Sequence, residues 1–440
     1  MASGIANIGK VPELRRRLLF TLFILAVYRV GIFVSIPGVD RSVMANIMAR
    51  SSGTMMGLFD MFSGGAVKQL SIFALGVMPY ISASIILQLL TVVSPTLAEL
   101  RKEGEVGYRR INQYTRYLAV AISFVQSFGI ALYLEGLNQS STYGSVVTEA
   151  NWWFRLMTMI SLTAGTAFLM WLGEQITERG IGNGISLIIM IGIVARYPAD
   201  FLDTWRAMQI GTLSPLRLVL LILIMVVVIA GVILITQGQR RIPVQYAKRI
   251  VGRRVYGGKA QYIPLRVNTA GVIPIIFAQS IMMFPSTIAA FFTANSFMQS
   301  VVSALNPYGI IYNTLYATII IFFTYFYTAI ILNPVDLAEN MQKYGGFIPG
   351  IRPGKRTSDY IDRILTRVTL PGAFFLAFIA ILPDMMIKWG KLPATVYFGG
   401  TGLLIVVGVM LDTLQQIETH LLMRHYDGFM KKGRLQGRRF

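Results

Sequence analysis

The chain contains no cysteine and little charge: only 14% of its 440 residues are charged. Without cysteine it has no disulfide framework, no thiolate metal site and no cysteine nucleophile. A soluble protein with so few charges would struggle to cover its surface. Long apolar runs dominate instead, in a sequence that is 54% hydrophobic. This composition is typical of a polytopic helical membrane protein.

Signatures of catalysis and of ion coupling are also missing. The sequence has no Walker-type phosphate loop, no HExxH, no GxSxG and no paired catalytic carboxylates, so we predict no enzymatic activity, no cofactor and no metal site. The two histidines lie in the basic C-terminal region and fit a solvated tail better than a metal site. The predicted spans are nearly free of carboxylates, which ion-coupled transporters need, and Arg29 is their clearest ionisable residue.

Apolar runs of about 20 residues, the length that crosses a bilayer as a helix, occur about ten times. The first run lacks a small-residue cleavage site and is long enough to span, so we interpret it as a retained helix and not a signal peptide. The predicted spans are 18–36, 72–94, 114–134, 152–172, 184–197, 214–236, 269–292, 309–332, 368–387 and 395–415.

The net charge of +20 is distributed unequally between the two sides of these spans. If the N-terminus is placed inside, the inside segments hold 30 Lys and Arg residues and the outside segments hold 9. Cytoplasmic loops of membrane proteins carry the excess of Lys and Arg. We therefore expect both termini on the cytoplasmic side.

One motif occurs twice, in FALGVMPYISASII (73–86) and NTAGVIPIIFAQSI (268–281). The copies lie in the second and seventh predicted spans, the second of each group of five, which favours an inverted repeat. We expect the proline to break or kink each helix, and such paired interruptions point to a translocation pathway between repeats. Gly and Pro are also common in ordinary membrane helices. The matches are Gly76/Gly271, Val77/Val272, Pro79/Pro274, Ile81/Ile276, Ala83/Ala278 and Ile86/Ile281.

Before the second span lies GLFDMFSGGAVKQLS (57–71), which is too short and too polar to cross a membrane. It is either a surface loop or a re-entrant segment, since irregular backbone is tolerated at membrane depth only inside a cavity. Nearby, helical spacing predicts two aliphatic stripes. They suit a pore that closes by dewetting, or ordinary packing against helices and lipid. The stripes are Val77, Ile81 and Ile85, and Ile185 and Ile189.

Two long segments expected on the cytoplasmic side, 237–268 and 333–367, are strongly basic. In the first, Val, Ile and Tyr alternate with Arg and Lys, which predicts a β-hairpin that stands off the membrane. Anchoring to anionic lipid is the ordinary role of such charges. Eight basic residues in one loop also suit a docking surface for an acidic partner or for RNA phosphate.

At this level of detail the chain resembles the SecY family, the central subunits of the bacterial Sec protein-translocation channel. The resemblance extends from LRRRLLF at residue 14 to about Leu422. It rests on MFSGGAVKQLSIFALGVMPYISASII, PTLAELRKEGEVGYRRINQYTRY, MWLGEQITERGIGNGIS, YAKRIVGRRVY, GFIPGIRPGKRT and YFGGTGLLIVV. It implies an all-α polytopic membrane protein of about ten transmembrane helices in two inverted five-helix halves, a clamshell around an hourglass pore. The implied divisions are a cytoplasmic segment 1–17, halves 18–197 and 198–422, and a basic cytoplasmic tail 423–440.

The resemblance also implies functional positions. A plug that seals the outer funnel would occupy 57–71, including Phe59, Phe62, Gly64 and Gly65. A lateral gate between the second and seventh spans would carry a polar cluster at Ser82, Gln126 and Asn268. Docking contacts would fall on Arg253, Arg254 and Arg352, since the arginine fork pairs with carboxylate and phosphate. A pore ring would consist of Val77, where isoleucine is expected, Ile81, Ile185, Ile189, Ile276 and Ile405.

The implied function is a protein-conducting channel of the bacterial cytoplasmic (inner) membrane. It would pass unfolded secretory polypeptides across and release hydrophobic segments laterally, driven by SecA or the ribosome. The implied partners are SecE, SecG, the SecA ATPase, the ribosome with its rRNA, signal sequences, nascent polypeptides and anionic lipids. The alternative is an inverted-repeat secondary transporter of a small solute, against which the scarce carboxylates and large basic loops count. An intramembrane enzyme lacks a catalytic constellation.

Overall fold

The computed structural model describes residues 11–50, 57, 60, 62–140, 145–211, 213–246, 249–251, 254–256, 261–289, 309–390 and 400–432. The chain divides into two compact units. The first comprises Met1–Asp203, Met283–Ser303 and Val409–Phe440, and the second comprises Thr204–Met282 and Ala304–Gly408. The sequence-based boundaries at 17, 197 and 422 stay predictions.

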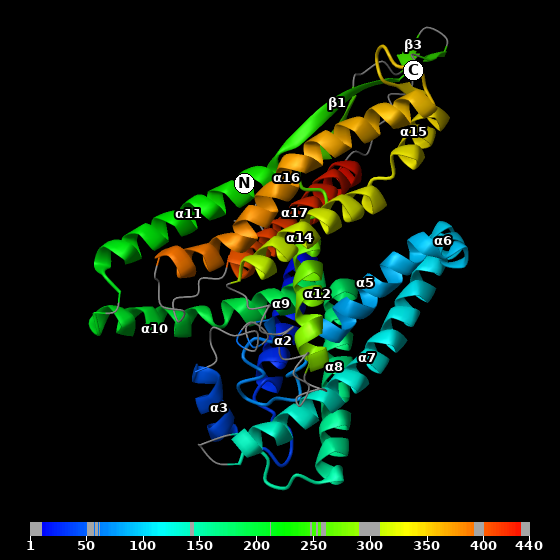
Figure 1. Cartoon of the computed structure of the whole chain (residues 1–440). Coiled ribbons are helices and arrows are strands. Elements are labelled where there is room, and N and C mark those ends of the chain that lie inside the picture. The colour runs from blue at the N-terminus through cyan, green and yellow to red at the C-terminus, as the bar shows by residue number, and fades with distance from the viewer. Residues whose placement is uncertain are drawn as a thin grey trace. The chain divides into compact units, whose positions relative to one another are not determined.

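The first unit is built from helices. They are α2 (Pro12–Gly31), α3 (Arg41–Arg50), α5 (Met78–Val93), α6 (Pro95–Lys102), α7 (Glu105–Ser140), α8 (Trp152–Arg179), α9 (Gly184–Val194) and the start of α10 (Tyr197–Gln209). Helices α5 and α6 meet at a bend of 98°. Ser94 is extended there because Pro95 follows it, and the residue before a proline avoids helical geometry. The bend returns the chain so that α7 lies beside α5 (Figure 1).

The second unit contains most of the remaining helices and all the described strands. They are α11 (Pro215–Gln237), β1 (Gln239–Tyr246), β2 (Arg249–Val251), β3 (Arg254–Tyr256), β4 (Gln261–Arg266), α12 (Ile273–Ala289), α14 (Ile310–Ile331), α15 (Pro334–Lys343), β5 (Gly346–Phe347), α16 (Lys355–Gly390) and α17 (Gly400–Lys432). The last residues of α12, and α17 from Val409 onward, belong to the first unit.

Seven described helical segments are long and apolar enough to cross a membrane, or eight if the bent pair α5–α6 is one span. The predicted ten-helix fold is consistent with this result. The other predicted spans correspond to α2, which begins with several charged residues, and to α12, which has 17 residues. The chain is therefore a polytopic helical membrane protein.

The repeated motif begins helices and does not interrupt them. Gly76 and Gly271 both have positive φ, 58° and 64°, the left-handed region that glycine enters readily. The prolines follow in the first turns of α5 and α12. The expected break within each helix was therefore wrong, because a proline in the first turn has no intrahelical hydrogen bond to lose. The local hydrogen bonds correspond too: Ile81 N–H donates to the Val77 carbonyl at 3.1 Å, and Ile276 N–H to that of Val272 at 3.2 Å.

The hairpin predicted in 237–268 is confirmed. Strand β1 pairs antiparallel with β4, from Gln239 opposite Arg266 to Val244 opposite Gln261. Ile242 and Val244 are buried while their neighbours on β1 are exposed, the alternation of a half-buried strand. Strands β2 and β3 form a second antiparallel pair.

The second basic segment joins the same structure, because β5 pairs with the end of β1. Strands β1, β4 and β5, helix α15 and the first turns of α16 share one apolar core, and we call this assembly the basic module. It lies at one end of α16 (Figure 1). Its buried residues are Ile242, Val244, Leu265, Met341, Ile348, Ile361 and Leu365.

The shared core predicts how the basic module responds to truncation. Ile361→Ala removes a side chain that is 0% exposed and should destabilise the module by about 2–5 kcal/mol. Val335→Ala removes a comparable side chain that is 52% exposed and should change stability by only about 0.5 kcal/mol. Native-state proteolysis of the loops measures both, since cleavage follows the open population. Equal cleavage of the two variants would contradict a shared core.

Candidate functional site

The described residues before α5, namely 57, 60 and 62–77, pack inside the first unit, and we call them the re-entrant segment. Its second part pairs with the turn after α2. Ile36 N–H donates to the Leu70 carbonyl at 2.8 Å, and Ile72 N–H donates to the Val34 carbonyl at 3.0 Å. Irregular backbone thus has the partners that a membrane interior demands. Its apolar side chains Val67, Leu70, Ala74 and Leu75 are buried with Leu134, Phe154 and Leu162.

Residues Ser63, Gly64 and Gly65 form the tip of the re-entrant segment, and the backbone of this tip contacts α9. Gly64 and Gly65 have φ values of 71° and 87°. A Cβ atom added to Gly64 would lie 2.8 Å from Gly192 Cα, whereas one added to Gly65 would have nothing within 4 Å. Position 64 therefore admits only glycine without displacement. Phe62, just before the tip, is buried; Phe59, also predicted for the plug, lies outside the described residues.

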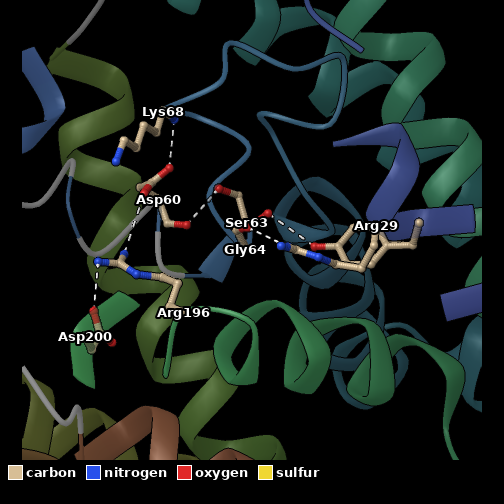
Figure 2. Close-up of polar contacts among 8 residues, drawn as sticks. Arg29, Asp60, Ser63, Gly64, Lys68, Arg196 and Asp200 are labelled. Atoms are coloured by element: carbon tan, nitrogen blue, oxygen red, sulfur yellow. Dashed lines mark hydrogen bonds and ion pairs between the residues drawn. The ribbon is translucent and has the colours of Figure 1, made fainter. Parts of the chain in front are cut away.

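Two side chains of α2 bind carbonyls at the tip. The Tyr28 hydroxyl donates to the Ser63 carbonyl at 3.2 Å. Arg29 Nη1 donates to the Gly64 carbonyl at 3.0 Å (Figure 2). Both carbonyls would otherwise be buried acceptors, which is costly in an apolar interior. Arg29, the conspicuous charge in the first predicted span, therefore has a structural partner in the re-entrant segment.

Asp60 has a buried carboxylate, and its hydrogen bonds hold the tip in place. Its side chain accepts a hydrogen bond from the Lys68 N–H at 2.8 Å, and Oδ2 lies 3.6 Å from Arg196 Nη1. Its own carbonyl accepts the Ser63 hydroxyl and the Gly65 N–H. Burial raises the pKa of Asp60 above its ordinary value, although the Lys68 N–H and the Arg196 cation oppose this shift.

The sequence analysis did not single out Asp60 or Arg196. The available signal was an acid within a mostly apolar segment, 57–71, and an arginine near the end of the predicted span 184–197. Nothing in the sequence pairs the two, because they belong to distant segments. The structure therefore identifies the Asp60–Arg196 ion pair as a contact of the predicted plug that the sequence analysis missed.

The positions predicted for a pore ring fall in both units. In the first unit Val77, Ile81 and Ile189 are buried, and Ile185 is half-buried against Gly173 of α8. In the second unit the two positions of the ring, Ile276 and Ile405, are buried as well. The ring itself stays a prediction.

The polar positions predicted for the lateral gate are largely buried. Gln126 of α7 and Asn268 are buried, and Ser82 of α5 is half-buried. Asn268 Nδ2 donates to the Gly271 carbonyl at 3.1 Å, while its Oδ1 has no hydrogen-bond partner in the described part of the chain. An acid that the sequence analysis did not single out, Asp384, is also buried in α16.

Two of the three predicted docking arginines belong to the described residues. Arg352 is exposed in the turn before α16, where its carbonyl accepts the Thr357 hydroxyl at 2.9 Å. Arg254 is the first residue of β3, and Arg253 lies outside the described residues. The described residues contain no group of three His, Cys, Asp or Glu side chains that would hold a metal.

Known proteins resemble this chain over nearly its whole length. A profile of the SecY family matches residues 71–414. The protein translocase subunit SecY of Escherichia coli strain K12 is 49% identical over 98% of this chain and 96% of its own. One solved structure is of a SecY protein whose plug domain is described as stabilising the closed state of the translocation channel. It aligns with this chain with a TM-score of 0.61 at 17% sequence identity, over 94% of this chain and 96% of its own. Sec61 in the canine ribosome-channel complex aligns with a TM-score of 0.60 at 16% identity and the same coverage.

Two adjacent glycines provide a matched test of the tip. Gly64→Ala and Gly65→Ala both place a side chain at positive φ, which costs about 1–2 kcal/mol. Only the alanine at position 64 also overlaps the backbone of α9. Gly64→Ala should therefore loosen the re-entrant segment more than Gly65→Ala does.

The measurement uses the absence of native cysteine. Ser63→Cys, at a buried serine, is introduced as the only thiol, and its rate of maleimide labelling reports detachment of the tip. We expect labelling at least about tenfold faster with Gly64→Ala than with Gly65→Ala, a difference of about 1.4 kcal/mol. Equal rates would mean that contact with Gly192 does not hold the tip.

Proposed function

Because the chain belongs to the SecY family, we propose that it is the channel subunit of a protein translocase. It passes unfolded secretory polypeptides across the cytoplasmic membrane of a bacterium and releases hydrophobic segments sideways into the lipid. The observation that carries this proposal is the re-entrant segment, which fills the interior of the first unit with irregular backbone. Irregular backbone at membrane depth belongs in a cavity, and a segment that seals this cavity is the part that a translocating channel must move.

In the proposed mechanism the re-entrant segment is a plug. An apolar signal sequence inserts between the helices that bear the repeated motif, α5 and α12, and stabilises an open state by burying its side chains, at roughly 25 cal/mol per Å². A ligand shifts such an equilibrium only if it prefers one state. The plug then leaves, and the chain passes between aliphatic side chains, which offer water no hydrogen bonds and select no sequence.

The driving force comes from partners that dock on the cytoplasmic side. We assign this role to the basic module, which exposes Arg240 and Arg241, together with the exposed Arg352 in the turn before α16. Arginine pairs with both carboxylate and phosphate, so the module suits the SecA ATPase and ribosomal RNA. The relationship to Sec61 of a ribosome-channel complex supports the ribosome as a partner. SecE and SecG would complete the membrane complex, and anionic lipids would contact its positive side.

We propose cytoplasmic termini because of the distribution of Lys and Arg, and the bacterial inner membrane because the chain belongs to the SecY family. The solute-transporter alternative finds no support, since the relatives and structures named above are translocase subunits and channels. The channel needs no bound cofactor, because the energy is supplied by translation or by ATP hydrolysis on SecA.

A stalled precursor tests the pathway. Photo-crosslinking residues at Ile81 and Ile276, in vesicles with SecE, SecG and SecA, should crosslink to the middle of a secretory precursor only when ATP is present. Both side chains are buried, whereas Val226 of α11 is 55% exposed, and a probe there should give no crosslink to the same region. If neither buried site crosslinks while the precursor is halfway across, these residues do not line the pathway.

A charge reversal tests the docking surface. Arg352→Glu should weaken binding of SecA and of ribosomes about tenfold, because a charge-assisted contact becomes repulsive, and salt should diminish the difference. Arg217→Glu is the control, since this exposed arginine lies at the end of α11 opposite to β1. Sedimentation with membrane vesicles measures both. Equal loss of binding in the two variants would indicate a nonspecific charge effect and contradict the assignment.

A further inference from the structure

Arg196 occupies a shared position between two carboxylates. It lies in the two-residue turn between α9 and α10. Its Nη1 is 3.6 Å from Asp60 Oδ2, and its Nη2 is 4.0 Å from Asp200 Oδ1 (Figure 2). Asp60 belongs to the re-entrant segment, while Asp200 lies four residues beyond Arg196 and moves with it. Arg196 is therefore shared between an acid of the re-entrant segment and an acid in the first turn of α10.

The two acids differ in what happens to them when the re-entrant segment leaves. When the re-entrant segment is seated, the Asp60 carboxylate is buried and pairs with Arg196, whose cation stabilises it more than that of Lys68 does. When the segment leaves, Asp60 becomes hydrated and Arg196 keeps Asp200. Leaving a buried charge without its partner is strongly unfavourable, whereas removing both partners is often neutral. Loss of Arg196 thus leaves the buried Asp60 carboxylate without its ion-pair partner in the seated state. Departure of the segment leaves no buried carboxylate without a partner, because Asp60 becomes hydrated and Arg196 keeps Asp200.

We propose that Arg196 and Asp200 form a holder for Asp60 that sets how readily the plug is released, and hence how strong a signal sequence must be to open the channel. This inference rests on the proposed function. Arg196 makes the seated state tolerable for an ionised Asp60. Asp200 balances Arg196 after release and so keeps opening accessible. Both are positioning residues that act through the plug.

The raised pKa of Asp60 supports the same asymmetry, because it shows that burial of the carboxylate is only partly offset. Asp60→Asn retains a side-chain oxygen for the Lys68 N–H and removes the buried charge. We therefore expect this variant to seat at least as firmly as the parent. The effect of Arg196→Gln should then depend on whether position 60 carries a charge.

The test uses the complete translocase in proteoliposomes. Ion leak without precursor reports seating of the plug. Export of a precursor with a shortened apolar signal, relative to one with an intact signal, reports the opening threshold. Arg196→Gln should raise the leak and the relative export of the weak-signal precursor about tenfold. Asp60→Asn with Arg196→Gln should return both to within about twofold of the parent, and Asp200→Asn should lower the relative export.

Lys68→Gln is the matched control, because it removes an exposed positive charge from the same segment and keeps the backbone N–H that binds Asp60. It should raise the leak far less than Arg196→Gln. The proposal is overturned if the double variant leaks as much as Arg196→Gln, since the Arg196 effect would then be packing alone. It is also overturned if Asp200→Asn behaves like Arg196→Gln. Failure of the parent to export the intact-signal precursor would instead reject the proposed function, whatever the leak pattern.

Discussion

Irregular backbone inside a membrane protein must find all its hydrogen-bond partners within the protein, because lipid offers none. Much of the first unit is arranged around this requirement. The turn after α2 pairs with Leu70 and Ile72, and Tyr28 and Arg29 bind the carbonyls at the tip. Helix α2 is therefore a clamp for the re-entrant segment as well as a span, which accounts for an arginine near its end.

The same requirement explains the repeated motif. A helix that begins within the membrane leaves its first N–H groups without intrahelical partners. A proline in the first turn removes one of these donors, and a glycine at positive φ lets the preceding chain turn sharply. Gly76 with Pro79 and Gly271 with Pro274 apply this solution once in each unit. The two helices are alike because they solve the same problem at their first residues.

Much of the fold could be predicted from the sequence because its signals are local. Hydropathy located the spans, and alternation located the β1–β4 hairpin. The role of Pro79 was misjudged, since hydropathy does not reveal where within an apolar run the helix starts. The pairing of β5 with β1, which unites the two basic segments, and that of Asp60 with Arg196, have no local signal. Both pairings depend on packing between distant segments, which leaves no recognisable pattern in a single sequence.

The contact between Gly64 and Gly192 has a genetic consequence. A Cβ atom on Gly64 would clash with Gly192 Cα at 2.8 Å, and a Cβ atom on Gly192 would press on Gly64 Cα at 3.2 Å. A steric clash in a protein core is usually relieved when a neighbouring side chain is replaced by a smaller one. Neither glycine can be made smaller, because glycine has no side chain. Second-site suppressors of a substitution at one glycine must therefore arise elsewhere, through shifts of α2 or α9 themselves. This point of the channel is constrained to evolve by moving whole helices, and not by exchanging one side chain for another.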